Sequence, residues 1–281
     1  MNQRHETMPD DTHTRGASPE ADVSGAPPPG GARGVRIPQY SIGQVLAVWA
    51  AAALPMGALA WLVAPALADR LSGEGNLPLA KALLICLTIG LIWQFVLVVI
   101  LVGREQRTLR WSTIREALWL RSPRSPRSGR VGGRVWLILI PLIVALAAEE
   151  FIPDLSSPVG RDLPAFLDSE AGQSFFSGNW AWFGLIVVFV LFNTVLGEEL
   201  LFRGLLLPRM NGAFGRGDWL ANGVLFAVYH LHVPWVMLAG LVGAFVIAYP
   251  TKRYRSAWIG IAVHSAQSVV TAVLVLTLVL R

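Results

Sequence analysis

The residues with the chemistry of a catalytic site lie in the last third of the chain, within otherwise apolar stretches. They are Glu198, Glu199, Arg203, His230 and His264. A charged side chain at the centre of a bilayer costs roughly 2.5–3.5 kcal/mol on insertion scales, and such residues usually face a protein interior or a water-filled cavity. Their concentration in one region therefore predicts a single shared polar site.

The two adjacent glutamates are expected to have different roles because they face different sides of a helix. Glu199 and Arg203 are four residues apart, so they are neighbours on one helical face and can neutralise each other. Glu198 is rotated by about 100° from Glu199. We therefore predict a structural ion pair between Glu199 and Arg203 and a free carboxylate at Glu198. The alternative is an ion pair that only fixes a helix end, with Glu198 reaching toward the interface.

Each histidine shares a helical face with a residue four positions away, Phe226 with His230 and His264 with Ser268. At about 1.5 Å per residue, Glu198 and both histidines lie roughly 10–18 Å from the cytoplasmic ends of their spans. We expect them to share one polar chamber that opens toward the cytoplasm. A histidine on an apolar face is also compatible with a purely structural role.

A carboxylate with two histidines is the set of groups that activates water. The carboxylate accepts the proton of the water, and histidine assists or binds a metal. A second histidine and a hydroxyl or amide can then stabilise the oxyanion. Hydrolysis of a peptide bond within a membrane fits this set, and so does proton transport. A transporter would need a polar path through both leaflets, which the first two spans do not offer.

The surrounding elements are expected to be membrane-spanning helices. The chain has 281 residues, is 54% hydrophobic and has a mean hydropathy of +0.53. A spanning helix needs about 20 apolar residues. Seven apolar stretches predict an all-α, polytopic helix bundle, and they are 43–68, 82–103, 135–153, 181–206, 218–233, 234–250 and 257–280. The fifth and sixth are short, so a hairpin that reaches part-way, or one broken at Pro234, is the alternative for 218–250.

The charges of the loops predict the orientation. Segment 104–134 has nine arginines against Glu105 and Glu116, whereas segment 154–170 is acidic. Basic loops stay on the cytoplasmic side. We therefore place the N-terminus inside and expect a multi-pass protein of a bacterial-type cell membrane, with the lipid bilayer as its surroundings. The net charge of +5 follows from this topology, so no nucleic-acid partner is expected.

The chain divides into three regions. Residues 1–36 are rich in Pro, Gly and charge and predict a disordered cytoplasmic tail. Residues 37–134 form an N-terminal two-span region with the basic cytoplasmic loop, and residues 135–281 form a catalytic membrane domain. The only cysteine, Cys86, lies in the second span, so no intrachain disulfide can form.

Three further residues resemble site residues without being assigned to the site. Glu149 and Glu150 form another carboxylate pair, but no arginine follows four residues later, so we expect solvated residues at a helix end. His232 follows His230 by two and would face away from it on a helix. We expect it at the outer interface, with a role as an extra ligand as the alternative.

The order of the motifs resembles the type II CAAX prenyl protease family, also known as the CPBP family of intramembrane metalloproteases, with bacteriocin-processing and self-immunity (Abi-like) members. The motifs are "EELLFR" at 198–203, "FAVYH" at 226–230 and His264 in "AVHSAQS". The resemblance covers residues 135–275. It implies that Glu198 is the catalytic glutamate, His230 its partner and His264 the residue that holds the oxyanion or a metal.

One position departs from the family pattern, which often has Asn four residues after the third-motif histidine. This chain has Ser268 there, and a hydroxyl reaches less far than an amide. We expect Ser268 to support the oxyanion, with weaker stabilisation. Gln267 is one residue off that face and is expected to be only a weak substitute.

The resemblance implies an intramembrane endopeptidase that hydrolyses a peptide bond of a membrane-associated or lipidated protein or peptide. The alternative is a catalytically silent member of the same fold that acts as a membrane regulator or self-immunity protein. The family name suggests a metal, and Glu198, His230 and His264 would be its zinc ligands. These ligands come from three separate helices, so we expect metal-free catalysis, with zinc as the alternative.

Overall fold

The computed structural model describes residues 35–152 and 155–281. The described residues form helices and no strand, which confirms the predicted all-α class. Most of the predicted N-terminal tail, residues 1–34, lies outside the described residues, so its disorder stays a prediction. Val35–Arg281 form one compact unit.

The described chain folds into thirteen α-helices, and the long ones carry most of the apolar residues. In chain order the helices are α1 (Ile42–Ala58), α2 (Ala64–Ala68), α3 (Leu77–Gln106), α4 (Trp111–Ala117), α5 (Leu139–Ala147), α6 (Leu163–Asp168), α7 (Glu170–Phe176), α8 (Trp180–Leu191), α9 (Leu207–Arg209), α10 (Asn211–Phe214), α11 (Asp218–Tyr229), α12 (Met237–Tyr254) and α13 (Ala257–Val279). Short 3₁₀ segments precede α5, follow α5, and precede α11 and α12; they are Gly133–Ile138, Ala148–Phe151, Gly215–Gly217 and Pro234–Val236.

Five helical stretches of the described chain are long and apolar enough to cross a membrane, so the chain is a multi-pass membrane protein. They are Ile42–Ala68, Leu77–Gln106, Trp180–Arg209, Pro234–Tyr254 and Ala257–Val279. The predicted third and fifth spans are shorter than a span requires. The former is the apolar helix Gly133–Ala147, and the latter is α11, which has 12 residues. The predicted number of seven is therefore not confirmed, and the orientation in the membrane stays a prediction.

α11 and α12 form the hairpin that was the alternative for 218–250. α11 ends at Tyr229, a non-helical segment follows, and α12 begins after the 3₁₀ turn at Pro234. The proline has no N–H to continue a helix, which places the break at this position. α11 and α12 pack closely against each other.

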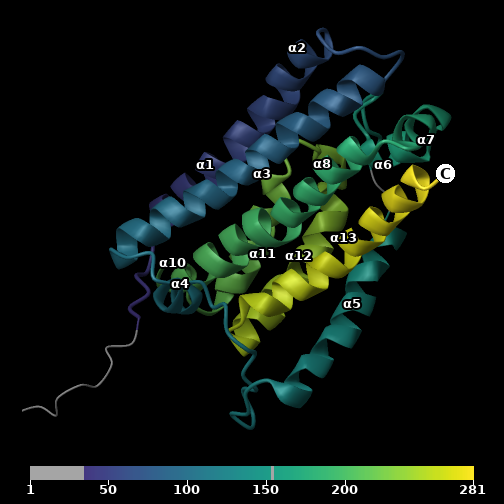
Figure 1. The fold of residues 1–281 in the computed structure, drawn as a ribbon. Helices are drawn as coiled ribbons and strands as arrows, with labels where there is room; N and C mark the ends of the chain where they lie inside the picture. Colours follow the sequence, from purple (N-terminus) through teal and green to yellow (C-terminus); the bar gives the residue numbers. More distant parts are fainter. Residues whose placement is uncertain (1–34, 153–154) are drawn as a thin grey trace, which may run out of the picture. The chain divides into compact units, whose positions relative to one another are not determined.

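The loops divide between the two ends of the helices. At one end, the backbone N–H of Ala257 donates to Trp119 O, and the N–H of Arg124 donates to Tyr254 O, which joins the basic segment 104–134 to the α12–α13 connection. At the other end, Gly178 N–H donates to Val279 O. In Figure 1, α4 and α10 lie at the first end, whereas α6, α7 and the C-terminus lie at the second. The basic loops thus share one end, as the topology prediction requires.

The main core joins the N-terminal spans to the C-terminal region. Leu91 and Val98 of α3 belong to the same buried cluster as Leu201, Phe202 and Phe226. In a membrane, such contacts stabilise the fold by van der Waals packing, because lipid is as apolar as these side chains. The predicted regions 37–134 and 135–281 therefore pack together, and the boundary between them stays a prediction about the sequence.

Candidate active site

The first motif lies in a stretch of helix that is wider than an α-helix. Phe192–Gly197 and Leu200–Leu206 are π-helical, and Glu198 and Glu199 lie between these two segments. π-helical turns in long helices occur frequently at functional sites. Residues 201–210 are all buried, so the motif is inside the protein rather than in contact with lipid.

Glu199 holds two partners at once. Its Oε1 atom lies 3.4 Å from the guanidinium of Arg203 and 3.1 Å from Nδ1 of His264. The side chains of Glu199 and Arg203 are both fully buried. The other oxygen, Oε2, occupies the space where a Cβ at Gly260 would lie. The ion pair predicted from spacing is present, and the same carboxylate also orients a histidine of α13.

Arg203 lies against an aromatic ring rather than among hydrogen-bond acceptors. The centre of its guanidinium is 4.0 Å from the centroid of the Phe226 ring, a cation–π contact. None of its three side-chain nitrogens has a hydrogen-bond partner among the described residues. Phe226 also contacts His230, with ring centroids 4.9 Å apart, and His264 at 6.2 Å. Phe226 thus connects the arginine to both histidines.

Glu198 has a separate environment, as its rotation from Glu199 predicts. It is 2% exposed and contacts the hydroxyl of Tyr229. Gln94 of α3 donates to the same hydroxyl at 2.6 Å, and Gln94 is fully buried. Glu198 also interacts electrostatically with His264. The carboxylate is therefore supported by Tyr229 of the second motif and, through its hydroxyl, by Gln94, which lies outside the motifs.

Both motif histidines line one cavity of about 130 Å³. A buried site needs about 10–15 Å³ of such volume for each water molecule, so several waters fit. The cavity is lined by Leu146, Glu149, Phe226, His230, Val236, Gly240, Gly243, Ala244, Ile247, His264 and Gln267. Glu198 is not one of these described lining residues. The structure therefore brings the two histidines to one cavity, whereas it leaves Glu198 outside the lining.

The hydrogen bonds of the histidines indicate which ring nitrogen is available. Nδ1 of His230 lies 2.9 Å from Phe226 O, and Nδ1 of His264 faces the Glu199 carboxylate. A carbonyl oxygen only accepts, so Nδ1 of His230 donates and carries the proton. This leaves Nε2 of His230 as the nitrogen that can accept a proton.

Part of the cavity lining comes from the helix ends that lie away from the basic loops. Glu149 follows α5, and Val236 precedes α12. Leu155 N–H donates to Trp235 O nearby, which joins this region to the acidic segment. The predicted opening of the chamber toward the cytoplasm stays a prediction.

Two residues set aside in the sequence are close to the site. Glu149 is partly buried and lines the cavity, so it is not a solvated helix-end residue; its carboxylate lies against Gly243, where there is no side chain to exclude it. His232 is 9% exposed, and its ring stacks on that of His230 with centroids 5.4 Å apart. The i,i+2 argument for opposite faces failed because residues 230–233 are not helical.

Of the two neighbours Gln267 and Ser268, Gln267 is the one among the described cavity-lining residues. Ser268 is buried on α13, one turn after His264. Gln267 is one of the residues that line the cavity together with His264. The face argument for Gln267 used an exact helical spacing, whereas a long side chain reaches across about 100° of a helix surface.

Zinc was the alternative to metal-free catalysis, and it would need Glu198, His230 and His264 to converge on one ion. Among the described residues, no group of three or more His, Cys, Asp or Glu side chains is arranged to hold a metal ion. Glu199, rather than Glu198, contacts Nδ1 of His264.

Sequence reasoning missed Tyr229 and Gln94 because it collected only ionisable groups that titrate near neutral pH. The signal that could have found Gln94 is an amide in the centre of the apolar span 77–106, where an unpaired polar group is costly. Tyr229 precedes His230 in the second motif, and its hydroxyl needs a partner when buried.

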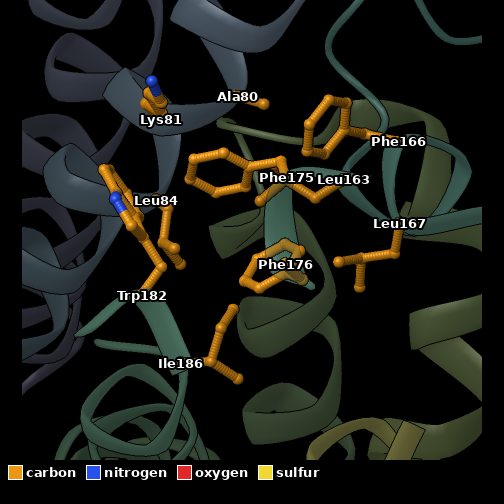
Figure 2. Close-up of a pocket in the computed structure, with 10 residues that line it drawn as sticks. All are labelled: Ala80, Lys81, Leu84, Leu163, Phe166, Leu167, Phe175, Phe176, Trp182 and Ile186. Atoms are coloured by element: carbon orange, nitrogen blue, oxygen red, sulfur yellow. The ribbon is translucent and has the colours of Figure 1, made fainter. Parts of the chain in front are cut away.

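A smaller pocket, beside α6 and α7, lacks this chemistry. Figure 2 shows Phe175, Phe176 and Trp182 around a space of about 40 Å³. Lys81 is its only charged lining residue in the described chain, and its ammonium lies 5.0 Å from the centroid of the Phe175 ring. This pocket is an aromatic packing site and does not compete with the histidine cavity.

Comparison with known proteins supports the assignment from the motifs. Residues 179–270 match the model of the Rce1-like family, described as type II CAAX prenyl endopeptidase Rce1-like. No curated protein and no solved structure matches. The matched residues include every predicted site residue, from Glu198 to Ser268. Residues 179–270 are therefore similar to the Rce1-like family of type II CAAX prenyl endopeptidases.

Proposed function

We propose that the chain is an intramembrane endopeptidase that hydrolyses a peptide bond of a membrane-associated or lipidated protein or peptide. The observation that carries the proposal is the meeting of His230 and His264 in one cavity, inside the region that matches a protease family. A cavity within spanning helices selects substrates that are already held at the membrane.

Glu198 is the group that accepts the proton of the attacking water. It is almost fully buried and interacts with His264, which lines the cavity, so a water held at His264 lies near the carboxylate. Nε2 of His230 is available on the same cavity and takes part in the proton transfer. General acid–base catalysis of this kind contributes about 10²–10⁴-fold to the rate.

His264 stabilises the oxyanion that forms when water attacks the carbonyl carbon. The carboxylate of Glu199 fixes the ring through Nδ1, and the Nε2–H of the imidazolium is the donor to the oxyanion. Ser268 supports this site from α13. Gln267 offers a second donor, because it is one of the residues that line the cavity. Glu199 and Arg203 form the structural pair that positions the histidine.

The reaction in this proposal needs no metal. Two histidines and a carboxylate supply a base and an oxyanion donor without one. Activity of the purified protein before and after a chelator tests this part. Stoichiometric zinc whose removal stops cleavage and whose return restores it would reject metal-free catalysis.

The proposal is tested by cleavage of an internally quenched peptide that ends in a prenylated cysteine motif. The full chain is purified in detergent and compared with Glu198→Gln, His230→Ala and His264→Ala. We expect each variant to lose about 10²-fold or more of the activity, because glutamine cannot accept a proton and each alanine removes a ring nitrogen. The same peptide without the lipid measures the contribution of the membrane anchor.

A matched control is Glu74→Gln, the same isosteric change at an exposed glutamate. It should retain full activity. Full activity in any of the three site variants would remove that residue from the mechanism. Absence of cleavage by the wild-type protein, folded and with both peptides, would favour the non-catalytic alternative, a regulator or self-immunity protein of the same fold.

A further inference from the structure

A large basic pocket lies at the end of the helices where the arginine-rich loop meets the α12–α13 connection. Its volume is about 950 Å³, at the upper end of the range for small-molecule sites. Its lining residues come from four separate parts of the chain, around residues 37, 119–129, 207–219 and 249–255. The pocket is thus a product of tertiary structure and is distinct from the histidine cavity.

The charge of this pocket is strongly positive. Six cationic side chains line it, namely Arg121, Arg124, Arg216, Lys252, Arg253 and Arg255. Asp218 is the one carboxylate in the described lining, and it forms an ion pair with Lys252. The five arginines therefore remain as excess positive charge, and arginine is the side chain best suited to bind phosphate oxygens in pairs.

The walls of the pocket are held by hydrogen bonds, one of which is made by the Arg121 side chain. Arg121 Nε donates to Arg255 O at 3.0 Å, and Ser256 Oγ donates to Arg121 O at 2.6 Å. Together with the backbone bond from Arg124 to Tyr254, these contacts fix the loop against α12 and α13. The basic side chains are therefore presented by a defined frame and not by a free loop.

The charges around Arg121 also favour the binding of an anion. Burial lowers the pKa of Arg121 from its ordinary value, and the neighbouring charges of Arg255 and Arg124 lower it further, although Glu116 acts in the opposite sense. Like charges are thus held together at a cost. A bound anion would relieve this repulsion.

The pocket also lies at the depth of lipid headgroups. Its lining residues Leu207, Pro208, Tyr249, Lys252 and Arg253 lie at the ends of the apolar helical stretches Trp180–Arg209 and Pro234–Tyr254. Trp119, Trp219 and Tyr249 line it, and such aromatic side chains are enriched at the membrane–water interface. Basic pockets between spanning helices on the cytoplasmic side bind anionic headgroups.

We propose that this pocket binds a phosphate group, supplied by the headgroup of an anionic phospholipid. Its position at the ends of two spans and its aromatic lining favour a lipid source. A soluble phosphate ester has the same binding chemistry and is the other source. The proposal does not depend on the protease activity.

The test measures binding of fluorescent phosphatidylglycerol to the full chain in neutral detergent micelles. The pocket variant is Arg121→Gln/Arg253→Gln. The matched control is Arg127→Gln/Arg130→Gln, which removes the same charge from exposed arginines of the same loop that do not line the pocket. With about 1 kcal/mol for each basic residue near a membrane surface, the pocket variant should bind about thirtyfold more weakly. The control should bind like the wild type.

Two competition arms separate the sources of the phosphate. If millimolar glycerol phosphate displaces the labelled lipid as well as unlabelled phosphatidylglycerol does, a soluble phosphate is the ligand. If only the lipid competes, the apolar part contributes and the lipid is the ligand. Either result supports a phosphate site, provided that the pocket variant has lost it.

Equal lipid binding by the wild type and the pocket variant would overturn the proposal. Equal weakening in the control variant would also overturn it, because the binding would then be diffuse attraction to the loop. Thermal unfolding of each variant shows whether it is folded. Should the double variant fail to fold, Arg253→Gln alone changes an exposed side chain, and its expected weakening is about fivefold.

Discussion

Two buried arginines on the same stretch of chain, Arg203 and Arg209, are held in opposite ways. Both are fully buried, and both face a glutamate. Arg209 donates to both carboxylate oxygens of Glu105 at 2.6–3.1 Å, and to Ala117 O and Leu205 O at 3.2 and 2.8 Å. Arg203 has one ion pair at 3.4 Å and no hydrogen bond within the described chain.

The cluster around Arg209 is closed on itself. Tyr40 donates its hydroxyl to Glu105, and burial, followed by this hydrogen bond, raises the pKa of Tyr40, so the hydroxyl stays protonated. Tyr40 N–H also donates to Arg209 O. The cluster joins α3, α4, α9 and the segment before α1. Its hydrogen-bonding capacity is used within the protein, as expected of a structural pair.

The cluster around Arg203 is open toward the candidate site. Its carboxylate, Glu199, divides its interactions between the arginine and His264. Buried polar groups without partners are rare in proteins and call for a functional explanation. The difference teaches that two buried ion pairs on one stretch of chain can differ in how completely their hydrogen bonds are satisfied, and that the less satisfied pair is the one that contacts the candidate site.

The largest effect is expected for Arg209→Ala. It removes five hydrogen bonds and leaves Glu105 without its cation, which should cost about 4 kcal/mol of unfolding free energy. The thermal midpoint in detergent should fall by roughly 10 °C. Arg127→Ala, at an exposed arginine, is the control and should leave the midpoint unchanged.

For Arg203→Ala we expect the unfolding free energy to fall by less, about 2 kcal/mol. The substitution removes only one long ion pair and one cation–π contact. His264 remains as a partner for Glu199 and limits the cost. The measurement is the same thermal midpoint. A loss equal to that of Arg209→Ala would break the comparison, and a fully stable but inactive variant would show that Arg203 acts in the chemistry.

Gly260→Ala, on α13, tests how closely the Glu199–Arg203 pair is packed against that helix. A methyl group there would collide with Oε2 of Glu199, so the carboxylate must move, at a cost of about 1–2 kcal/mol. Cleavage should fall with it because His264 loses its orientation. Gly184→Ala is the matched control on α8, where a Cβ meets open space; it should be neutral or stabilising by about 0.5–1 kcal/mol.

The smallest effect concerns the donors on the cavity side of His264. We expect Gln267→Ala to lower kcat by about tenfold and Ser268→Ala to lower it less, because only Gln267 of the two is among the cavity-lining residues. Steady-state kinetics with the quenched peptide measures both variants. A greater loss in Ser268→Ala would return the oxyanion role to the position that the family pattern indicates.

Much of the site could be predicted from residue types and spacing. The cost of charge in an apolar stretch identified Glu198, Glu199, Arg203, His230 and His264, and the i,i+4 spacing predicted the Glu199–Arg203 pair that the structure contains. The order of the motifs identified the family that residues 179–270 match. These features are local, so a single sequence expresses them.

Predictions failed where they assumed that helices continue. His232 was placed away from His230, and the fifth span was drawn through 230–233, because both arguments assumed helical geometry beyond Tyr229. Glu149 was placed in solvent because no arginine follows it. Its actual neighbours are Gly243 and the histidine cavity, which lie about a hundred residues later in the sequence.

The sequence by itself determined the membrane class, the similarity of residues 179–270 to the Rce1-like family and the candidate site residues, because apolar length and charge cost act along the chain. Only the tertiary structure decided which carboxylate contacts which histidine. It also decided that Arg209 has hydrogen-bond acceptors while Arg203 has none among the described residues. Packing brings Glu105 and Ala117 O to Arg209, whereas it brings the ring of Phe226 to Arg203. Hydrogen-bond completeness depends on groups distant in sequence, and no local pattern encodes it.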